Sequence, residues 1–150
     1  RLAAETEALE GVLGAREGLL IEIGAQETDI LRLVQGIPLH AASFSYELKS
    51  GETAEWKQSF LRALDEFYYL GPLSSAVFMV GEGAAIPELR KTLEGHDWLK
   101  NYSHLESVDV RAIPGTRLLE GNSLDGNIGG WEDFGLASLI YYAMHLEKLF

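Results

Sequence analysis

The chain has 150 residues, of which 47% are hydrophobic, so it is long enough for one domain with a buried core. Its formal charge of -11 at pH 7 argues against nucleic acid as a partner, because a nucleic-acid footprint needs lysine and arginine facing the phosphates. The absence of cysteine excludes disulfides and thiolate metal sites and suits a reducing compartment. No apolar run reaches the roughly 18 residues of a membrane span, and we expect a cytoplasmic protein.

The first third of the chain predicts a helix followed by three strands. Residues Leu2 to Leu13 have an amphipathic helical pattern, and the nearly continuous apolar run from Gly18 to Ile23 indicates a buried strand. Two more strands are expected at Thr28 to Val34 and Leu39 to Tyr46, joined by a tight turn over residues 35–38. Such closely connected strands form a meander, so the strand from Thr28 should run antiparallel to its neighbours.

The clearest helix is predicted from Ala54 to Leu70. Its apolar residues recur at spacings of three and four and form one stripe, which must face the sheet. Gly71 and Pro72 then end the helix. The stripe consists of Trp56, Phe60, Ala63, Leu64, Phe67 and Tyr68.

The remainder of the chain alternates strands and helices. Ser75 to Val80 reads as a buried strand that leads through residues 81–83 into a helix starting near Pro87, because proline is favoured in a first helical turn. Ser107 to Ile113 alternates apolar and polar residues and predicts a fifth strand, and Glu132 to Phe150 predicts a closing helix. Helical crossovers require parallel strands, so the strand from Ser75 should lie inside the sheet.

This order of elements is that of the ribonuclease-H-like fold, an α/β fold with a five-stranded mixed sheet flanked by helices. Two motifs make the resemblance more specific. The stretch Glu22 to Ile30 resembles the second phosphate loop of actin-like ATPases, in which an acidic residue, a glycine and small residues precede a threonine. The stretch Val80 to Leu89 resembles the adenosine motif of the same superfamily, a strand that ends in glycines before a helix.

Within that superfamily the chain is most similar to the second large subdomain of the PilM and FtsA group of pilus-assembly and cell-division proteins. Residues 5–9 also resemble the helix that joins the two halves of those proteins. The similarity covers nearly the whole chain but only the second half of a family member, and no methionine precedes Arg1. We therefore expect residues 1–150 to be a single actin-like subdomain, the C-terminal half of a longer protein.

The resemblance implies that the full-length protein binds ATP and Mg²⁺ between a phosphate loop from each half. No protein residue is predicted to ligate a metal directly, because the histidines are far apart and lack ligand spacing. The residues that match the two motifs, and that the resemblance assigns to cofactor binding, are Gly24, Ala25, Gln26, Thr28, Gly81, Glu82, Gly83 and Ala84.

Departures from the motifs predict a degenerate nucleotide site. Glu22 replaces the leading aspartate and keeps its charge, so it is the one catalytic candidate, as a group that orients a metal-bound water. Gln26 and Glu27 stand where glycine or threonine is usual, and Glu82 replaces the second glycine of the adenosine motif. The segment Phe44 to Ala54 is too short for the small fourth subdomain. With one half of the cradle, the chain is expected to bind no nucleotide and to have no enzymatic activity alone.

The first functional hypothesis is therefore a cytoplasmic actin-like scaffold subdomain that serves pilus assembly, secretion or cell division. Its expected partners are the missing N-terminal subdomain and assembly-machinery proteins at the cytoplasmic face of the inner membrane. An apolar last helix and a reduced insertion also predict exposed apolar surface and self-association.

Two alternatives stay open at this stage. Ribonuclease-H-like nucleases place carboxylates at the ends of the first and fourth strands, where Glu22 and Glu82 lie, with Asp125 or Glu132 as a third ligand for a two-metal mechanism. The acidic charge of the chain opposes this reading. The other alternative is a peptide-binding adaptor without a small-molecule ligand, which the sequence does not separate from the scaffold.

Overall fold

The computed structural model describes residues 16–47, 53–95, 97–102 and 105–119, together with positions 8, 10, 11, 14, 130, 131, 133–135 and 137–139. The strands are β1 (Gly18–Ile23), β2 (Glu27–Val34), β3 (Ile37–Ser45), β4 (Ala76–Val80) and β5 (Asp109–Ala112). The α-helices are α2 (Ala54–Asp65), α3 (Pro87–Glu94) and α4 (Thr116–Leu119), and short 3₁₀ helices are η1 (Tyr68–Leu70), η2 (Glu82–Ala85) and η3 (Leu99–Asn101).

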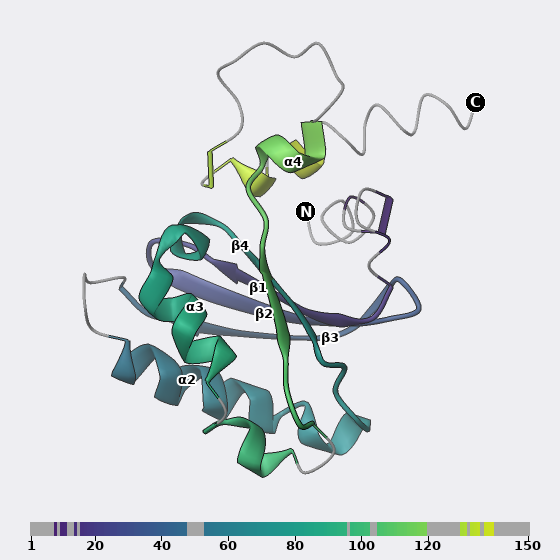
Figure 1. Cartoon of the computed structure of the whole chain (residues 1–150), viewed down its shortest axis with the longest axis vertical. Coiled ribbons are helices and arrows are strands. Elements are labelled where there is room, and N and C mark those ends of the chain that lie inside the picture. Colours follow the sequence, from purple (N-terminus) through teal and green to yellow (C-terminus); the bar gives the residue numbers. More distant parts are fainter. Residues whose placement is uncertain are drawn as a thin grey trace.

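The five strands form one mixed sheet in the order β3-β2-β1-β4-β5 (Figure 1). Strand β2 runs antiparallel to both β1 and β3, whereas β1 with β4 and β4 with β5 are parallel pairs. The five-stranded mixed sheet, the antiparallel second strand and the internal position of β4 are therefore confirmed. The parallel pairs follow from crossover connections that contain helices, while the short connections between β1, β2 and β3 require antiparallel pairing.

The β2–β3 turn is tighter than the sequence predicts. Gln35 and Gly36 both have positive φ angles, 54° and 77°, as a two-residue hairpin loop of the primed type requires. Strand β3 therefore begins at Ile37 rather than Leu39, and Pro38 pairs with Leu33 where the register shifts. Proline is tolerated there because β3 is an edge strand and the position adjoins a bulge.

The helix predicted from Ala54 to Leu70 is shorter in the structure. Helix α2 ends at Asp65 and the chain continues into η1. The guanidinium of Arg32, on β2, donates hydrogen bonds to the carbonyl oxygens of Leu70 (2.7 Å) and Pro72 (2.9 Å). These long-range bonds hold the chain after η1 against the sheet, and they satisfy carbonyls that a continuing helix would have bonded itself.

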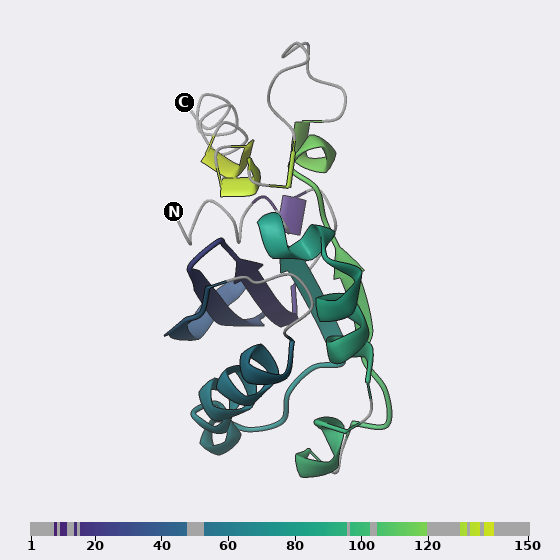
Figure 2. The same ribbon diagram turned by 90° about the vertical axis from the view of Figure 1, so that its left-hand side faces the viewer.

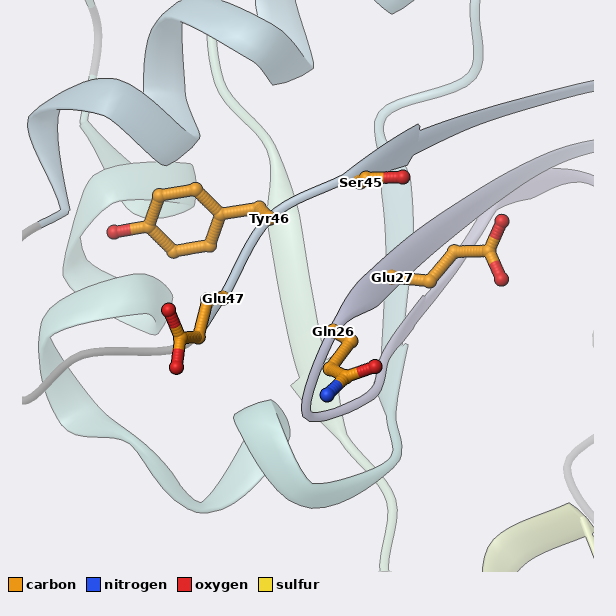
Figure 3. Close-up of a pocket in the computed structure, with 5 residues that line it drawn as sticks. All are labelled: Gln26, Glu27, Ser45, Tyr46 and Glu47. Atoms are coloured by element: carbon orange, nitrogen blue, oxygen red, sulfur yellow. The ribbon is translucent and has the colours of Figure 1, made fainter.

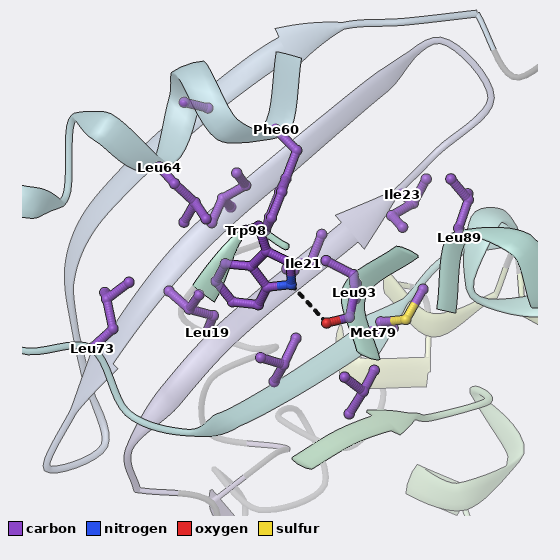
Figure 4. Packing of buried hydrophobic residues seen from close by; sticks show 14 of the residues in the cluster. Leu19, Ile21, Ile23, Phe60, Leu64, Leu73, Met79, Leu89, Leu93 and Trp98 are labelled. Atoms are coloured by element: carbon purple, nitrogen blue, oxygen red, sulfur yellow. Dashed lines mark hydrogen bonds between the residues drawn. The ribbon is translucent and has the colours of Figure 1, made fainter. Parts of the chain in front are cut away.

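Alternate residues of the strands supply two separate hydrophobic cores, one on each face of the sheet. On the first face, the ring of Trp56 stacks on Phe60 (centroids 5.2 Å apart), and Trp98 meets Phe60 edge-on at 5.6 Å. The indole Nε1 of Trp98 donates to the carbonyl oxygen of Leu93 (2.8 Å), so its polar atom is satisfied inside the core (Figure 4). This cluster joins β1, β4, α2, α3 and η3.

The second core lies on the opposite face and includes described residues from near both chain ends. Leu20, Phe78 and Val80 pack there with Ala8 and Phe134. Figures 1 and 2 show the described residues near the two ends lying away from α2. Positions 8, 10 and 11 and positions 134, 135 and 137–139 are helical, as predicted, and the rest of the helices expected at Leu2–Leu13 and Glu132–Phe150 lies outside the described residues.

In the part of the chain that the structure describes, every helix is too short or too polar to cross a lipid bilayer.

The aromatic cluster should carry a large share of the stability. Phe60→Ala removes a ring packed between Trp56 and Trp98 and should lower the free energy of unfolding by about 3–5 kcal/mol. Gln58→Ala, at an exposed position of the same helix, is the matched control and should change it by less than about 0.5 kcal/mol. Urea unfolding followed by circular dichroism measures both. Equal effects of the two substitutions would contradict this account of the core.

Tyr102 predicts a specific loss of stability at alkaline pH. Burial, and to a lesser degree the Asp65 carboxylate, raises the pKa of Tyr102 to about 12 from its ordinary value of 10.0. The folded state therefore holds the neutral phenol, whose contribution to stability is complete below pH 10.0 and is lost as pH rises through about 12. Tyr102→Phe cannot ionise and should lose less stability than the parent chain over this interval. Unfolding curves at a series of pH values test this, and parallel losses would refute it.

Candidate functional site

The two segments that the sequence singles out lie side by side at one end of the sheet. Strands β1 and β4 are parallel neighbours in which Glu22 pairs with Val80, so their carboxyl ends meet. The turn after β1 (residues 24–26) and the segment after β4 (Gly81 and η2) therefore leave the sheet together. In open α/β sheets this edge is where ligands bind.

Contact with β1 explains why glycine is required after β4. Gly81 has a φ angle of 82°, and a Cβ atom built on it would lie 2.7 Å from the carbonyl oxygen of Ile23. A Cβ atom on Gly83 would overlap the side chain of Ile23, with its Cβ only 2.6 Å away. Real Cβ atoms do not approach so closely, so the end of β1 occupies the space that these two glycines leave open.

The other residues of the predicted adenosine segment divide between core and solvent. Ala84 is buried in the first hydrophobic core, and Glu82 is exposed. The amide of Ala84 donates to the carbonyl oxygen of Gly81 (3.0 Å), and the amide of Ile86 donates to that of Gly83 (3.0 Å), which closes the 3₁₀ turn. Helix α3 then begins at Pro87, as predicted. Residues 81–84 line neither of the two cavities found beside the phosphate loop.

The turn after β1 borders a cavity of about 280 Å³. The structure brings Glu22, the catalytic candidate, together there with three predicted phosphate-loop residues, Gly24, Ala25 and Gln26. The amide of Gly24 donates to the carbonyl oxygen of Glu27 (2.9 Å), so this backbone donor is used within the turn itself. Ala25 and Gln26 are exposed at its tip.

Thr28, the fourth predicted residue of the loop, has a structural contact instead. Its side chain is buried, and its Oγ1 accepts a hydrogen bond from the indole Nε1 of Trp56 (3.0 Å). Thr28 pairs with Ile23, whose side chain belongs to the same core. The hydroxyl thus satisfies the indole of α2 within that core, and it does not line either cavity.

Carboxylates dominate the remaining lining of the smaller cavity. Glu22, only 8% exposed, lies directly opposite Asp29 on β2, so both side chains point to the same face of the sheet. Asp29 Oδ1 accepts a hydrogen bond from the Oγ of Ser43 on β3 (2.5 Å). Glu27 also lines this cavity. Sequence analysis missed Asp29 and Ser43 as neighbours of Glu22, because only the register of the three strands places them in one row.

A second cavity of about 590 Å³ opens where β2 begins and β3 ends. Its lining comes from Gln26, Glu27, Ser45, Tyr46 and Glu47 (Figure 3). The amide of Tyr46 donates to the carbonyl oxygen of Gln26 (2.9 Å), which continues the pairing of the two strands one residue beyond β3. In Figure 3, Glu27 projects to the same side as Ser45, and Tyr46 and Glu47 project to the other side.

The nuclease alternative finds no support in the residues that the structure describes. Among them, no group of three or more His, Asp or Glu side chains is placed to hold a metal ion. Glu22 is buried beside the β1–β2 turn, whereas Glu82 is exposed on η2. Asp125 and Glu132, the proposed third ligands, lie outside the described residues.

Comparisons with known proteins identify the fold through structure alone. No protein-family model matches the sequence, and neither does any curated protein. The AlfA filament bound to AMPPNP matches with a TM-score of 0.53 over 98% of this chain at 11% identity. The activator of 2-hydroxyisocaproyl-CoA dehydratase from Clostridium difficile, with bound ADPNP, matches with a TM-score of 0.51 over 99% of this chain at 13% identity. The chain therefore has the actin-like ATPase fold.

The chain spans only part of these proteins, 44% of the AlfA chain and 69% of the activator. A PilM–PilN type IV pilus biogenesis complex also matches, at 15% identity over 93% of this chain and 51% of that chain. Its TM-score of 0.49 is too low to indicate which branch of the fold this chain represents.

The contact between Ile23 and the glycines after β4 can be tested without any ligand. Gly83→Ala places a methyl group against the side chain of Ile23 and should lower the free energy of unfolding by about 1–3 kcal/mol. Gly24→Ala is the matched control, because its Cβ atom would meet nothing closer than the Glu27 carbonyl oxygen at 3.3 Å. The control should cost clearly less in thermal or urea unfolding. A Gly83→Ala protein as stable as the parent chain would contradict the packing role.

Proposed function

We propose that this chain is the second large subdomain of a cytoplasmic actin-like scaffold protein of the PilM and FtsA type, with a degenerate nucleotide site. Such a scaffold would serve pilus assembly, secretion or cell division. The observation that supports the degenerate site is that three acidic residues, Glu22, Glu27 and Asp29, line the cavity beside the phosphate loop.

Charge at this cavity disfavours a phosphate group. A phosphate-binding loop works through free backbone N–H groups and positive charge, which together attract an anion. Here the Gly24 amide already donates to the Glu27 carbonyl oxygen, and the described residues that line the cavity include no lysine or arginine. Three acidic side chains at the cavity add electrostatic repulsion, which acts more strongly where burial excludes water.

Packing after β4 gives the glycines a structural role that needs no nucleoside. In the superfamily pattern these glycines let the backbone approach the adenosine. In this chain the end of β1 fills the space next to Gly81 and Gly83, and Ala84 belongs to the hydrophobic core. The glycine pattern therefore has a sufficient explanation in the packing of two neighbouring strands.

Any ATP and Mg²⁺ held by the longer protein would then depend on contacts from its first half. The AlfA filament and the dehydratase activator were solved with AMPPNP and ADPNP respectively, and this chain spans less than half of the first and about two thirds of the second. Glu22 is in position to face a ligand in the smaller cavity, where it would orient a metal-bound water. Without the opposing phosphate loop, we expect no ATPase activity from the chain.

Partners in this proposal are the first half of the protein, assembly-machinery proteins at the cytoplasmic face of the inner membrane, and further copies of the chain. Exposed apolar side chains support a role in protein contacts. On η1, Tyr69 is 88% exposed and Leu70 is 47% exposed, although both are residue types that usually lie inside or at interfaces.

Nucleotide binding by the 150-residue chain tests the degenerate site. Isothermal titration calorimetry with ATP and Mg²⁺ should show no saturable heat at micromolar concentrations, because binding in that range needs about 8 kcal/mol of net free energy. In this proposal half of the phosphate contacts would come from the first half of the protein, and three acidic residues line the cavity beside the remaining loop.

Saturable heat that disappears in Ala25→Glu but persists in Ser107→Glu would overturn the degenerate site and restore a nucleotide-binding role. Both substitutions add one carboxylate at an exposed position, the first on the phosphate loop and the second before β5. They separate local repulsion from the effect of net charge. Gly81→Val is unsuitable for this purpose, because its side chain would strike Ile23 whether or not a ligand binds.

A further inference from the structure

The two edges of the sheet are protected to different degrees. Strand β5 is only four residues long and carries an ion pair between Arg111 and Asp109 (2.5 Å). Strand β3 is nine residues long; Pro38 and the register shift beside it protect its start, whereas residues 39–45 contain no proline, aspartate, glutamate, lysine or arginine, in a chain whose formal charge is -11. Proteins usually shield an exposed edge with charges, a short strand or a bulge, because unpaired backbone groups recruit other strands.

One face of β3 is committed to the first hydrophobic core. His40 meets the ring of Phe67 edge-on at 4.8 Å, and Phe44 packs against Trp56 at 6.1 Å. The alternate residues on the other face are exposed and mostly small, and they consist of Leu39, which is 60% exposed, and Ala41, Ser43 and Ser45. Beyond Leu39 this row contains only small side chains, and none of its residues carries a formal charge, so the row itself does not shield the edge.

Acidic side chains flank the end of this neutral edge. The cavity of about 590 Å³ is lined by Ser45 and Tyr46 at the end of β3, and by Glu27 and Glu47. Figure 3 shows the two glutamates projecting to opposite sides of the strand end. An added strand that passes this point would present successive side chains to the same two sides.

We propose that an extended basic segment of a partner protein pairs with β3 as an added edge strand. Two consecutive lysine or arginine residues at its end would face Glu27 and Glu47, one on each side of the sheet. Backbone hydrogen bonds along β3 would supply affinity, and the two charge pairs would set the register. This inference names a partner chemistry that goes beyond the proposed scaffold role, and it does not depend on the nucleotide site.

Charge decides between this occupant and a second copy of the chain. Two copies with a formal charge of -11 each would repel one another at the edge where Glu27 and Glu47 lie. A basic segment would instead be attracted by the acidic side chains near this edge, and β3 itself adds no positive charge that would repel it. An added strand of nine residues would extend about 30 Å along β3.

A labelled synthetic peptide can test the proposal on the 150-residue chain without nucleotide. The probe is a nonapeptide with Lys-Lys at both ends and alternating threonine and valine between them, so that either strand direction brings a lysine pair to Glu27 and Glu47. Fluorescence anisotropy should show saturable binding. Hydrogen exchange should show slower exchange of the β3 amides between Leu39 and Ser45 when the peptide is bound.

Variants and control peptides identify the surface. Glu27→Lys and Glu47→Lys should each raise the Kd of the peptide by about threefold to tenfold. Glu106→Lys makes the same change of charge at an exposed position between β4 and β5 and should leave the Kd within about twofold. Peptides with glutamate in place of lysine, or with a central proline, should not bind. If a lysine variant fails to fold, Glu27→Gln and Glu47→Gln take its place, and each should raise the Kd of the peptide by a smaller factor.

Three outcomes would overturn the proposal. The first is no saturable binding of the lysine peptide at millimolar concentration. The second is binding of the glutamate peptide with the same Kd as the lysine peptide. Binding of the lysine peptide with a Kd that neither Glu27→Lys nor Glu47→Lys changes, and without slower exchange of the β3 amides, counts equally. The third is a dimer in light scattering whose β3 amides are protected without peptide, because it would assign this edge to a second copy. ATP titration is a separate measurement, so failure here leaves the degenerate nucleotide site to be judged by calorimetry.

Discussion

The close contact between the end of β1 and the chain after β4 is the constraint on which the rest of this structure depends. Ile23 lies against Gly81 and Gly83, where no Cβ atom would fit. The two strands are thereby held as parallel neighbours, and both candidate segments leave the sheet at one edge. One packing interaction therefore accounts both for the glycines after β4 and for the meeting of the two candidate segments at one edge.

Polar contacts from β2 attach helix α2 and the chain that follows it to the sheet. The hydroxyl of Thr28 accepts from the Trp56 indole near the start of the helix, and the Arg32 guanidinium holds the carbonyl oxygens of Leu70 and Pro72 beyond its end. Both side chains are buried, so each bond also satisfies a group that would otherwise destabilise the core. Pairing of β2 with β1 and β3 fixes where these contacts are made. The geometry of the candidate site is thus set by the same strand.

Sequence patterns predicted the elements whose signals are local. The continuous apolar run of β1, the stripe of α2 and Pro87 at the start of α3 each specify an element without knowledge of its neighbours. Contacts between residues that are far apart in the sequence could not be predicted from such local patterns. The position of the chain after η1 depends on Arg32, about 40 positions earlier in the chain, and the row of Glu22, Asp29 and Ser43 depends on strand register. Of the eight residues predicted to bind a cofactor, Gly24, Ala25 and Gln26 line the smaller cavity, whereas Thr28 and residues 81–84 do not.

The acidity around the β1–β2 turn has opposite consequences for two kinds of ligand. Glu27 lines both cavities, so in the two proposals the same carboxylate would repel a phosphate on one side and attract a basic group on the other. Evolution of a nucleotide site would be expected to remove such a charge, whereas a surface that recognises a basic segment would retain it. The neutral edge of β3 ends beside this same carboxylate, and its Ser45 lines the larger cavity. The proposed loss of nucleotide affinity and the proposed protein contact would therefore be compatible results of one substitution pattern at the turn.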